Sequence, residues 1–343
     1  MIQRSAPGKL ILLGEYAVLE NAPALVLAVD RLARVTLTAR KGAGFRIHSP
    51  TLQFNNLEFD WNGDRLEALS APAREAAPKL NFVLTALEIL FTRFEWSRQT
   101  GWELTLNTDE FYDAGLSAKL GLGSSAAMTV ALVRALLAAH SQQISTESLF
   151  LLAQQIHSQA QGKSGSGIDI AAAAAGGFIY FRKEPLQIRP VNWPGDWQII
   201  PIFSGQSAST PQLVKQVRKL KEKHPAENRR LLEALAENSA EGCRAVEERD
   251  FSRFAARVER AQSLLRELGE KSGADIVSRP HQEIEKLVRD TGGYYKISGA
   301  GGGDLGLAFT NSPEIKEKIY TRFLHSPYKI VKLSPYFSGN AHN

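Results

Sequence analysis

The chain has 343 residues, 43% of them hydrophobic and 22% charged, which is enough apolar sequence for two globular cores of ordinary size. No apolar run reaches the roughly 18 residues of a membrane helix, the first residues form no secretory signal pattern, and a single cysteine, Cys243, excludes an internal disulfide framework. The formal charge of +5 comes from scattered Lys and Arg without a basic stripe, so we expect a cytoplasmic protein that binds a small anionic substrate and neither membrane nor nucleic acid.

The first part of the chain is predicted to be rich in strands. Runs of Val, Ile and Leu that are broken by Gly, Pro and Asn indicate strands, and these runs are at 2–13, 24–29, 33–39 and 104–106. Residues 126–140 differ, because their apolar side chains recur at helical spacing with no Pro or Gly, which predicts a buried helix.

The second part of the chain mixes strands with long helices. Its predicted elements are strands at 197–203, 294–297 and 305–309, a long helical region to about residue 268 opened by Ser-Thr-Pro at 209–211, and a helix opened by Asn-Ser-Pro at 311–313. A proline-containing stretch at 185–194 favours a domain boundary. We therefore expect one domain at 1–190 and another at 191–343.

A glycine and serine motif stands directly before the predicted helix. Backbone N–H groups and the positive end of a helix would converge there, which is an anion-binding arrangement, and the serine hydroxyls can add a hydrogen bond or a magnesium ligand. The simpler interpretation is a glycine turn with a serine N-cap. The motif consists of Gly121, Leu122, Gly123, Ser124, Ser125 and Ala126.

Two rival nucleotide motifs fit less well. The same segment matches a dinucleotide fingerprint, but Glu147, at the right distance for the ribose acid, lies in a helix-start pattern rather than at a strand end. The Gly-Lys-Ser triplet at 162–164 suggests a Walker A loop, yet His157 occupies the position of the required first glycine.

A second segment of small residues, 161–169, ends in an acid. Flexible residues that include Ser166 and Gly167 bring Asp169 into a tight turn ahead of an alanine-rich segment. A partly desolvated carboxylate suits the orientation or deprotonation of a hydroxyl. The alternative is an aspartate that caps the alanine helix.

Two further features complete the pattern. Residues 298–304, with the sequence Ser-Gly-Ala-Gly-Gly-Gly-Asp, form a loop of nearly bare backbone between two strands, which can press against a ligand or be a flexible hairpin. Lys9 stands on an otherwise apolar strand, where it is either an edge residue or a buried cation with an anionic partner.

Together and in this order, the four segments resemble the GHMP kinases over residues 6–309. The resemblance implies an ATP-dependent small-molecule kinase that uses Mg²⁺. It also implies an α+β fold in two domains, an N-terminal ATP-binding domain like ribosomal S5 domain 2 at 1–190 and a ferredoxin-like C-terminal substrate domain at 191–343. A monomer or a homodimer is expected.

Details of the sequence are similar to the phosphomevalonate kinases of this family. Tyr16 follows Gly-Glu where mevalonate kinases and galactokinases usually carry His, and His157 replaces a magnesium-binding Glu of mevalonate kinases. The resemblance implies phosphorylation of phosphomevalonate to diphosphomevalonate in the mevalonate route to isoprenoids. Mevalonate kinase, another kinase of sugars or sugar phosphates, diphosphomevalonate decarboxylase and a non-catalytic binding protein of the same fold remain alternatives.

The resemblance also implies residue roles. Asp169 orients or deprotonates the acceptor, Lys9 keeps Asp169 ionised, and Lys119 contacts the transferring or acceptor phosphate. Gly121 to Ala126 hold the ATP phosphates, and Ser125 is the metal ligand. The expected substrate-binding residues are Lys9, Tyr16, Ser166, Gly167, Asp169, Ser209, Ser298, Gly299, Ala300, Gly301 and Gly302.

Overall fold

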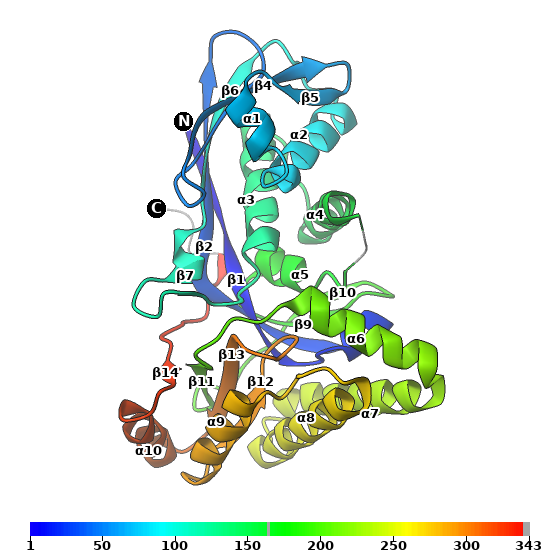
Figure 1. Ribbon diagram of the computed structural model, residues 1–343, viewed down its shortest axis with the longest axis vertical. Helices are drawn as coiled ribbons and strands as arrows, with labels where there is room; N and C mark the ends of the chain where they lie inside the picture. The colour runs from blue at the N-terminus through cyan, green and yellow to red at the C-terminus, as the bar shows by residue number, and fades with distance from the viewer. Residues whose placement is uncertain (163–164, 339–343) are drawn as a thin grey trace. The chain divides into compact units, whose positions relative to one another are not determined.

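The computed structural model describes residues 1–162 and 165–338, and Figure 1 shows its elements. Two residues of the Gly-Lys-Ser triplet, Lys163 and Ser164, lie outside the described residues. The chain divides into two compact units, each assembled from separate segments. The first unit comprises Met1–Gly8, Asp30–Phe111 and Leu122–Ala175, and the second comprises Lys9–Val29, Tyr112–Gly121 and Gly176–Asn343. The division into domains at 1–190 and 191–343 stays a prediction.

The first unit contains a mixed sheet and a group of helices. The second half of β2 (Ala24–Arg40) pairs antiparallel with β6 (Gly101–Asn107), β6 pairs parallel with β3 (Phe45–Ser49), and β4 (Phe54–Asn62) joins β3 to β5 (Arg65–Ala68) in antiparallel pairs. The helices are α1 (Ala71–Ala76), α2 (Asn81–Arg93), α3 (Ser124–Ala139), α4 (Thr146–Gln161) and α5 (Ile168–Ala175), with a short turn η2 (Asp109–Phe111). Helices α2, α3 and α4 pack on one another, and α5 packs on α3 and α4.

The second unit contains an antiparallel sheet with long helices. Its strands lie in the order β12 (Tyr294–Ile297), β13 (Leu305–Thr310), β11 (Gln198–Phe203) and β14 (Lys329–Ile330). Its helices are α6 (Thr210–Lys223), α7 (Pro225–Glu247), α8 (Phe251–Ser272), α9 (Arg279–Arg289) and α10 (Pro313–Leu324). Helices α7 and α8 lie side by side (Figure 1), and α8 and α9 contact β12.

The remaining strands of the second unit carry part of the predicted site. Strand β1 (Ile2–Leu13) begins in the first unit, continues into the second and pairs with β2. Strands β9 (Phe178–Arg182) and β10 (Gln187–Pro190) pair with one another, as do the short strands β7 (Tyr112–Asp113) and β8 (Ala118–Lys119). The turn η1 lies at Ala17–Glu20. A buried cluster joins Tyr16, Ile276 and Ile297 to leucines of α6, α7 and α8. This core fixes the backbone around the glycine-rich loop that follows β12.

Most predicted elements are confirmed, and two differ in detail. The prediction of separate strands at 24–29 and 33–39 is wrong, because β2 is continuous through Asp30 and Arg31. Those two polar side chains interrupt the apolar pattern but are only partly buried, so a strand can carry them without a break. The helical region after residue 209 consists of three helices, of which the second begins at Pro225, a residue suited to a first helical turn.

Candidate active site

The glycine and serine motif forms the start of α3. Gly123 is the N-cap residue, with φ 79° and ψ 41°, and Ser124 is the first helical residue rather than the cap. Within the described chain no side chain caps this helix, so its first N–H groups remain available to an anion. The helix begins two residues earlier than the predicted 126, because the serines continue the helical backbone.

Asp169 lies against this loop inside the first unit. A β-carbon at position 123 would lie 3.2 Å from Oδ2 of Asp169, so the carboxylate and the backbone at Gly123 are immediate neighbours. Gly167 has φ 81°, and a β-carbon there would lie 2.7 Å from Oε1 of Gln154. The sequence predicted Asp169 in a turn ahead of the helix. The structure instead places it in the first turn of α5. The compact glycine turn brings that helix close to the phosphate loop.

His157 lies beside the glycine and serine motif. In the sequence it stood out only because it replaces residues that other nucleotide-binding motifs require. Its Nε2 lies 3.4 Å from Oγ of Ser125, and its ring lies 4.8 Å from that of Phe82 at an interplanar angle of 33°. Burial lowers the pKa of His157 below its ordinary value, and the charge of Asp169 counteracts part of that effect. The imidazole therefore lies within the electrostatic reach of Asp169.

The donor set fits Mg²⁺ only if phosphate oxygens complete it. Among residues 1–162 and 165–338, no group of three or more His, Cys, Asp or Glu could hold a metal ion. Mg²⁺ is commonly bound by one or two protein oxygens together with substrate phosphates. The Ser125 hydroxyl and the Asp169 carboxylate are oxygen ligands of that type, whereas the partly buried His157 ring is not a preferred ligand of Mg²⁺.

The cationic residues of the predicted site belong to the second unit. Lys9 is only 8% exposed, and its Nζ donates a hydrogen bond of 3.3 Å to the carbonyl of Gly121. Lys9 is therefore a buried cation on β1, a strand that pairs with β2. Lys119 is exposed at the end of β8, next to the loop in sequence. The charges of both lysines lower the pKa of the Asp304 carboxyl against the effect of burial. Asp304 ends the glycine cluster, and the sequence alone indicated no role for it.

The glycine-rich loop is held by defined contacts and is not a free hairpin. Oγ of Ser298 accepts a hydrogen bond of 3.0 Å from the Ile11 amide and donates one of 3.1 Å to the Ile11 carbonyl. The Tyr16 hydroxyl donates to the Ala300 carbonyl at 2.7 Å. The Gly302 amide donates to the Ile276 carbonyl at 2.8 Å. The backbone of this loop is thus set by β1, by Tyr16 and by the segment before α9.

A buried ion pair lies under the start of the same loop. Lys296 and Glu15 are 0% and 2% exposed and contact one another, and Nζ of Lys296 also donates to the Ile297 carbonyl. The Gly299 amide donates to Glu15 Oε1 at 3.4 Å. Burial lowers the pKa of Lys296, and the Glu15 charge counteracts this. Breaking such a pair leaves a buried charge without a partner, so both residues are expected to be structurally indispensable.

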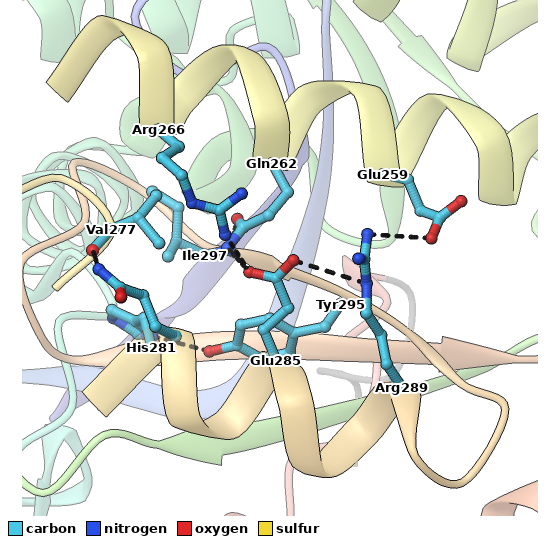
Figure 2. A network of polar contacts seen from close by, with 10 residues as sticks. Glu259, Gln262, Arg266, Val277, His281, Glu285, Arg289, Tyr295 and Ile297 are labelled. Carbon is cyan, nitrogen blue, oxygen red and sulfur yellow. Dashed lines mark hydrogen bonds and ion pairs between the residues drawn. The ribbon is translucent and has the colours of Figure 1, made fainter. Parts of the chain in front are cut away.

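A network of buried polar side chains anchors both ends of the loop. His281 Nε2 lies 2.9 Å from the Gly303 carbonyl. Its Nδ1 lies 2.7 Å from the Tyr295 hydroxyl (Figure 2). At the other end, the Ile297 amide donates to Gln262 Oε1 at 3.1 Å, and Gln262 Nε2 donates to Glu285 at 2.9 Å. Because a carbonyl only accepts, Nε2 of His281 carries the proton and Nδ1 accepts from Tyr295.

The neutral state of His281 predicts an acid-sensitive contribution to stability. Burial lowers its pKa from the ordinary 6.5 to about 4. Between these two values the unfolded state binds the extra proton, so this contribution is complete above pH 6.5 and is lost as the pH falls to about 4. The loss amounts to about 3 kcal/mol. His281→Gln, whose amide can still donate to Gly303, is expected to remove this part of the pH dependence of the free energy of unfolding.

The measurement is urea unfolding of both proteins at about pH 7 and about pH 4.5. Gln282→Leu is the matched control, because Gln282 lies on the same helix and donates to the Val277 carbonyl rather than to the loop. Equal pH dependence in the wild type and His281→Gln would show that His281 is not held neutral.

The predicted site residues are divided between the two units. The first unit holds Leu122 to Ala126, Ser166, Gly167 and Asp169. The second unit holds Lys9, Tyr16, Lys119, Gly121, Ser209 and Ser298 to Gly302. Ser209 is the N-cap residue of α6. None of the helices in the described part of the chain is long and apolar enough to span a membrane.

Comparison with known proteins identifies relatives over nearly the full length. Residues 81–177 match the family described as GHMP kinases N terminal domain. The chain is 29% identical to the phosphomevalonate kinase of a Streptomyces species, over 94% of this chain and 93% of that protein. It is also 29% identical to the mevalonate kinase of Thermococcus sibiricus, over 92% and 91% of the two chains.

A solved structure shares the fold. Streptococcus pneumoniae phosphomevalonate kinase in complex with phosphomevalonate and AMPPNP is 22% identical, with a TM-score of 0.80 over 98% of this chain and 100% of that chain.

Proposed function

We propose that this phosphotransferase, whose residues 81–177 match the GHMP kinases N terminal domain, transfers the γ-phosphoryl group of ATP to the phosphate of phosphomevalonate. The products are ADP and diphosphomevalonate. The α+β fold expected for such a kinase is confirmed. The acceptor is the proposed part, since both phosphomevalonate kinases and mevalonate kinases are relatives at the same identity.

One observation carries the choice of acceptor. Lys9 donates to the carbonyl of Gly121, whose Cα lies against the Asp304 carboxyl, and Lys119 precedes Gly121 by two residues. Two cations of the second unit therefore share the neighbourhood of Asp304, in agreement with the effect of both charges on the pKa of that carboxyl. A phosphate monoester carries close to two negative charges at neutral pH. Mevalonate lacks this group, and a pair of lysines gives no comparable advantage to a neutral hydroxyl.

The proposed roles follow from the chemistry of phosphoryl transfer, in which the protein mainly positions the reactants and neutralises charge. The uncapped start of α3 binds ATP phosphates. The Ser125 hydroxyl and the Asp169 carboxylate would hold Mg²⁺, which would supply charge neutralisation for the phosphates. Asp169 orients the acceptor oxygen. At neutral pH that oxygen is already ionised, so Asp169 acts as a base only on the monoanionic fraction of the substrate. Lys9 and Lys119 offset the negative charge of acceptor and transferring phosphate.

The experiment is an ADP-release assay with mevalonate, phosphomevalonate and diphosphomevalonate in parallel. We expect phosphomevalonate to give the highest kcat/KM. A higher kcat/KM for mevalonate contradicts the proposal in favour of mevalonate kinase. Release of carbon dioxide from diphosphomevalonate would instead identify a decarboxylase.

A further inference from the structure

Asp304, at the end of the glycine-rich loop, has a strained and firmly held backbone. Its φ is 55°, in the left-handed region that non-glycine residues rarely occupy. Its amide donates to the Gln206 carbonyl at 2.8 Å, and its carbonyl accepts from the Ser204 amide at 2.9 Å. Gly303, the preceding residue, is held by His281. Strain of this kind persists where the surroundings determine one conformation, and it is common at functional sites.

The side chain of Asp304 is directed by its contacts to Gly121, the first residue of the phosphate loop. Its Oδ1 accepts a hydrogen bond of 3.4 Å from the Ala208 amide. A β-carbon at position 121 would collide with Oδ2, so only glycine fits there beside the carboxylate. The carbonyl of the same Gly121 accepts the hydrogen bond from Lys9. Asp304 and Lys9 therefore both contact Gly121.

The electrostatics agree with this geometry. Burial raises the pKa of the Asp304 carboxyl, while the hydrogen bond from Ala208 and the charges of Lys9 and Lys119 counteract the rise. An anion in this position reduces the net positive charge that the two lysines present to an incoming phosphate. Like charges at short range oppose binding unless another interaction compensates.

We propose that Asp304 is the counter-anion of Lys9 and Lys119 and a specificity-determining residue of the acceptor site. Its carboxylate weakens the binding of simple anions to the lysines. A phosphate group therefore binds there effectively only when the rest of the substrate molecule makes further contacts with the protein. The inference rests on the proposed function in one respect, namely that these lysines bind the acceptor phosphate.

Asp304→Asn tests this with little change of shape, because the amide oxygen can still accept from Ala208 while the charge is removed. Inorganic phosphate is titrated calorimetrically into the substrate-free protein at about pH 8. We expect about tenfold tighter phosphate binding, as is typical for the loss of one close like charge. In steady state, inorganic phosphate is expected to inhibit the variant more strongly than the wild type, and the KM of the acceptor is expected to fall without a rise in kcat.

Two further variants separate charge from structure. Asp275→Asn removes an exposed carboxylate of the same unit and is expected to leave phosphate affinity unchanged. Asp304→Gly removes the charge and relieves the positive φ, so it should reproduce the tighter binding even if the Asn variant folds poorly.

Equal phosphate affinity in the wild type, Asp304→Asn and Asp304→Gly overturns the inference. The titration contains no acceptor, so it decides the role of Asp304 even if the enzyme prefers mevalonate, which would contradict only the proposed function.

Discussion

Asp169→Asn is expected to lower kcat by about 100-fold or more, while the affinity for ATP changes little. The reason is that the carboxylate lies beside Gly123 at the phosphate loop, where it would help to hold Mg²⁺ and accept the proton of a monoanionic acceptor, and catalytic contributions of this type are commonly of that size. Steady-state turnover and equilibrium ATP binding measure the two effects separately. If part of the loss reflects base catalysis on the monoanionic substrate, the loss is larger at about pH 5.5 than at about pH 8.

A second readout of Asp169→Asn does not depend on activity. Asp169 raises the pKa of His157 against the effect of burial, so its replacement is expected to lower that pKa further, as seen in an NMR titration of the ring protons. Asp64→Asn is the control, because Asp64 is 79% exposed in the β4–β5 turn. Near-normal kcat in Asp169→Asn would exclude Asp169 as the principal acidic residue of catalysis.

Lys119→Ala is expected to remove most of the preference for phosphomevalonate over mevalonate. A charge-assisted contact to phosphate contributes about 1.5 to 3 kcal/mol, which corresponds to roughly a 10-fold to 100-fold change in the ratio of the two kcat/KM values. Mevalonate has no phosphate to lose this contact, so its own kcat/KM should change less. The ratio in the wild type and in the variant is the quantity to compare.

Lys219→Ala supplies the control for this experiment, since Lys219 is exposed on α6. If Lys119→Ala leaves both kcat/KM values unchanged, Lys119 is a solvated surface residue. If it lowers both kcat/KM values equally, the lysine contacts the transferring phosphate rather than the acceptor.

Local sequence patterns predicted the helix behind the glycine and serine motif and many of the other elements. The start of α10 is one example, because Ser312 accepts a hydrogen bond from the Ile315 amide as the Asn-Ser-Pro pattern indicated. The helix behind the loop is another, since its apolar periodicity is strong and uninterrupted. Such features depend on residues that are close in sequence.

The residues that sequence reasoning missed depend on partners far along the chain. Asp304 follows an apparent flexible loop, and only the fold brings it to Gly121 and into the field of Lys9 and Lys119. His281 lies on an amphipathic helix, where nothing local distinguishes it from a core histidine. Its bond to Gly303 is formed by the packing of α9 against β12.

The central claim is that the acceptor is a phosphate group, and phosphorus NMR of the reaction products tests it most directly. With ATP, Mg²⁺ and phosphomevalonate, the account predicts that the phosphate monoester signal is replaced by two mutually coupled signals of a diphosphate ester, at a rate that Asp169→Asn reduces. A phosphomevalonate signal that stays unchanged, while mevalonate is converted to a new phosphate monoester under the same conditions, would contradict it.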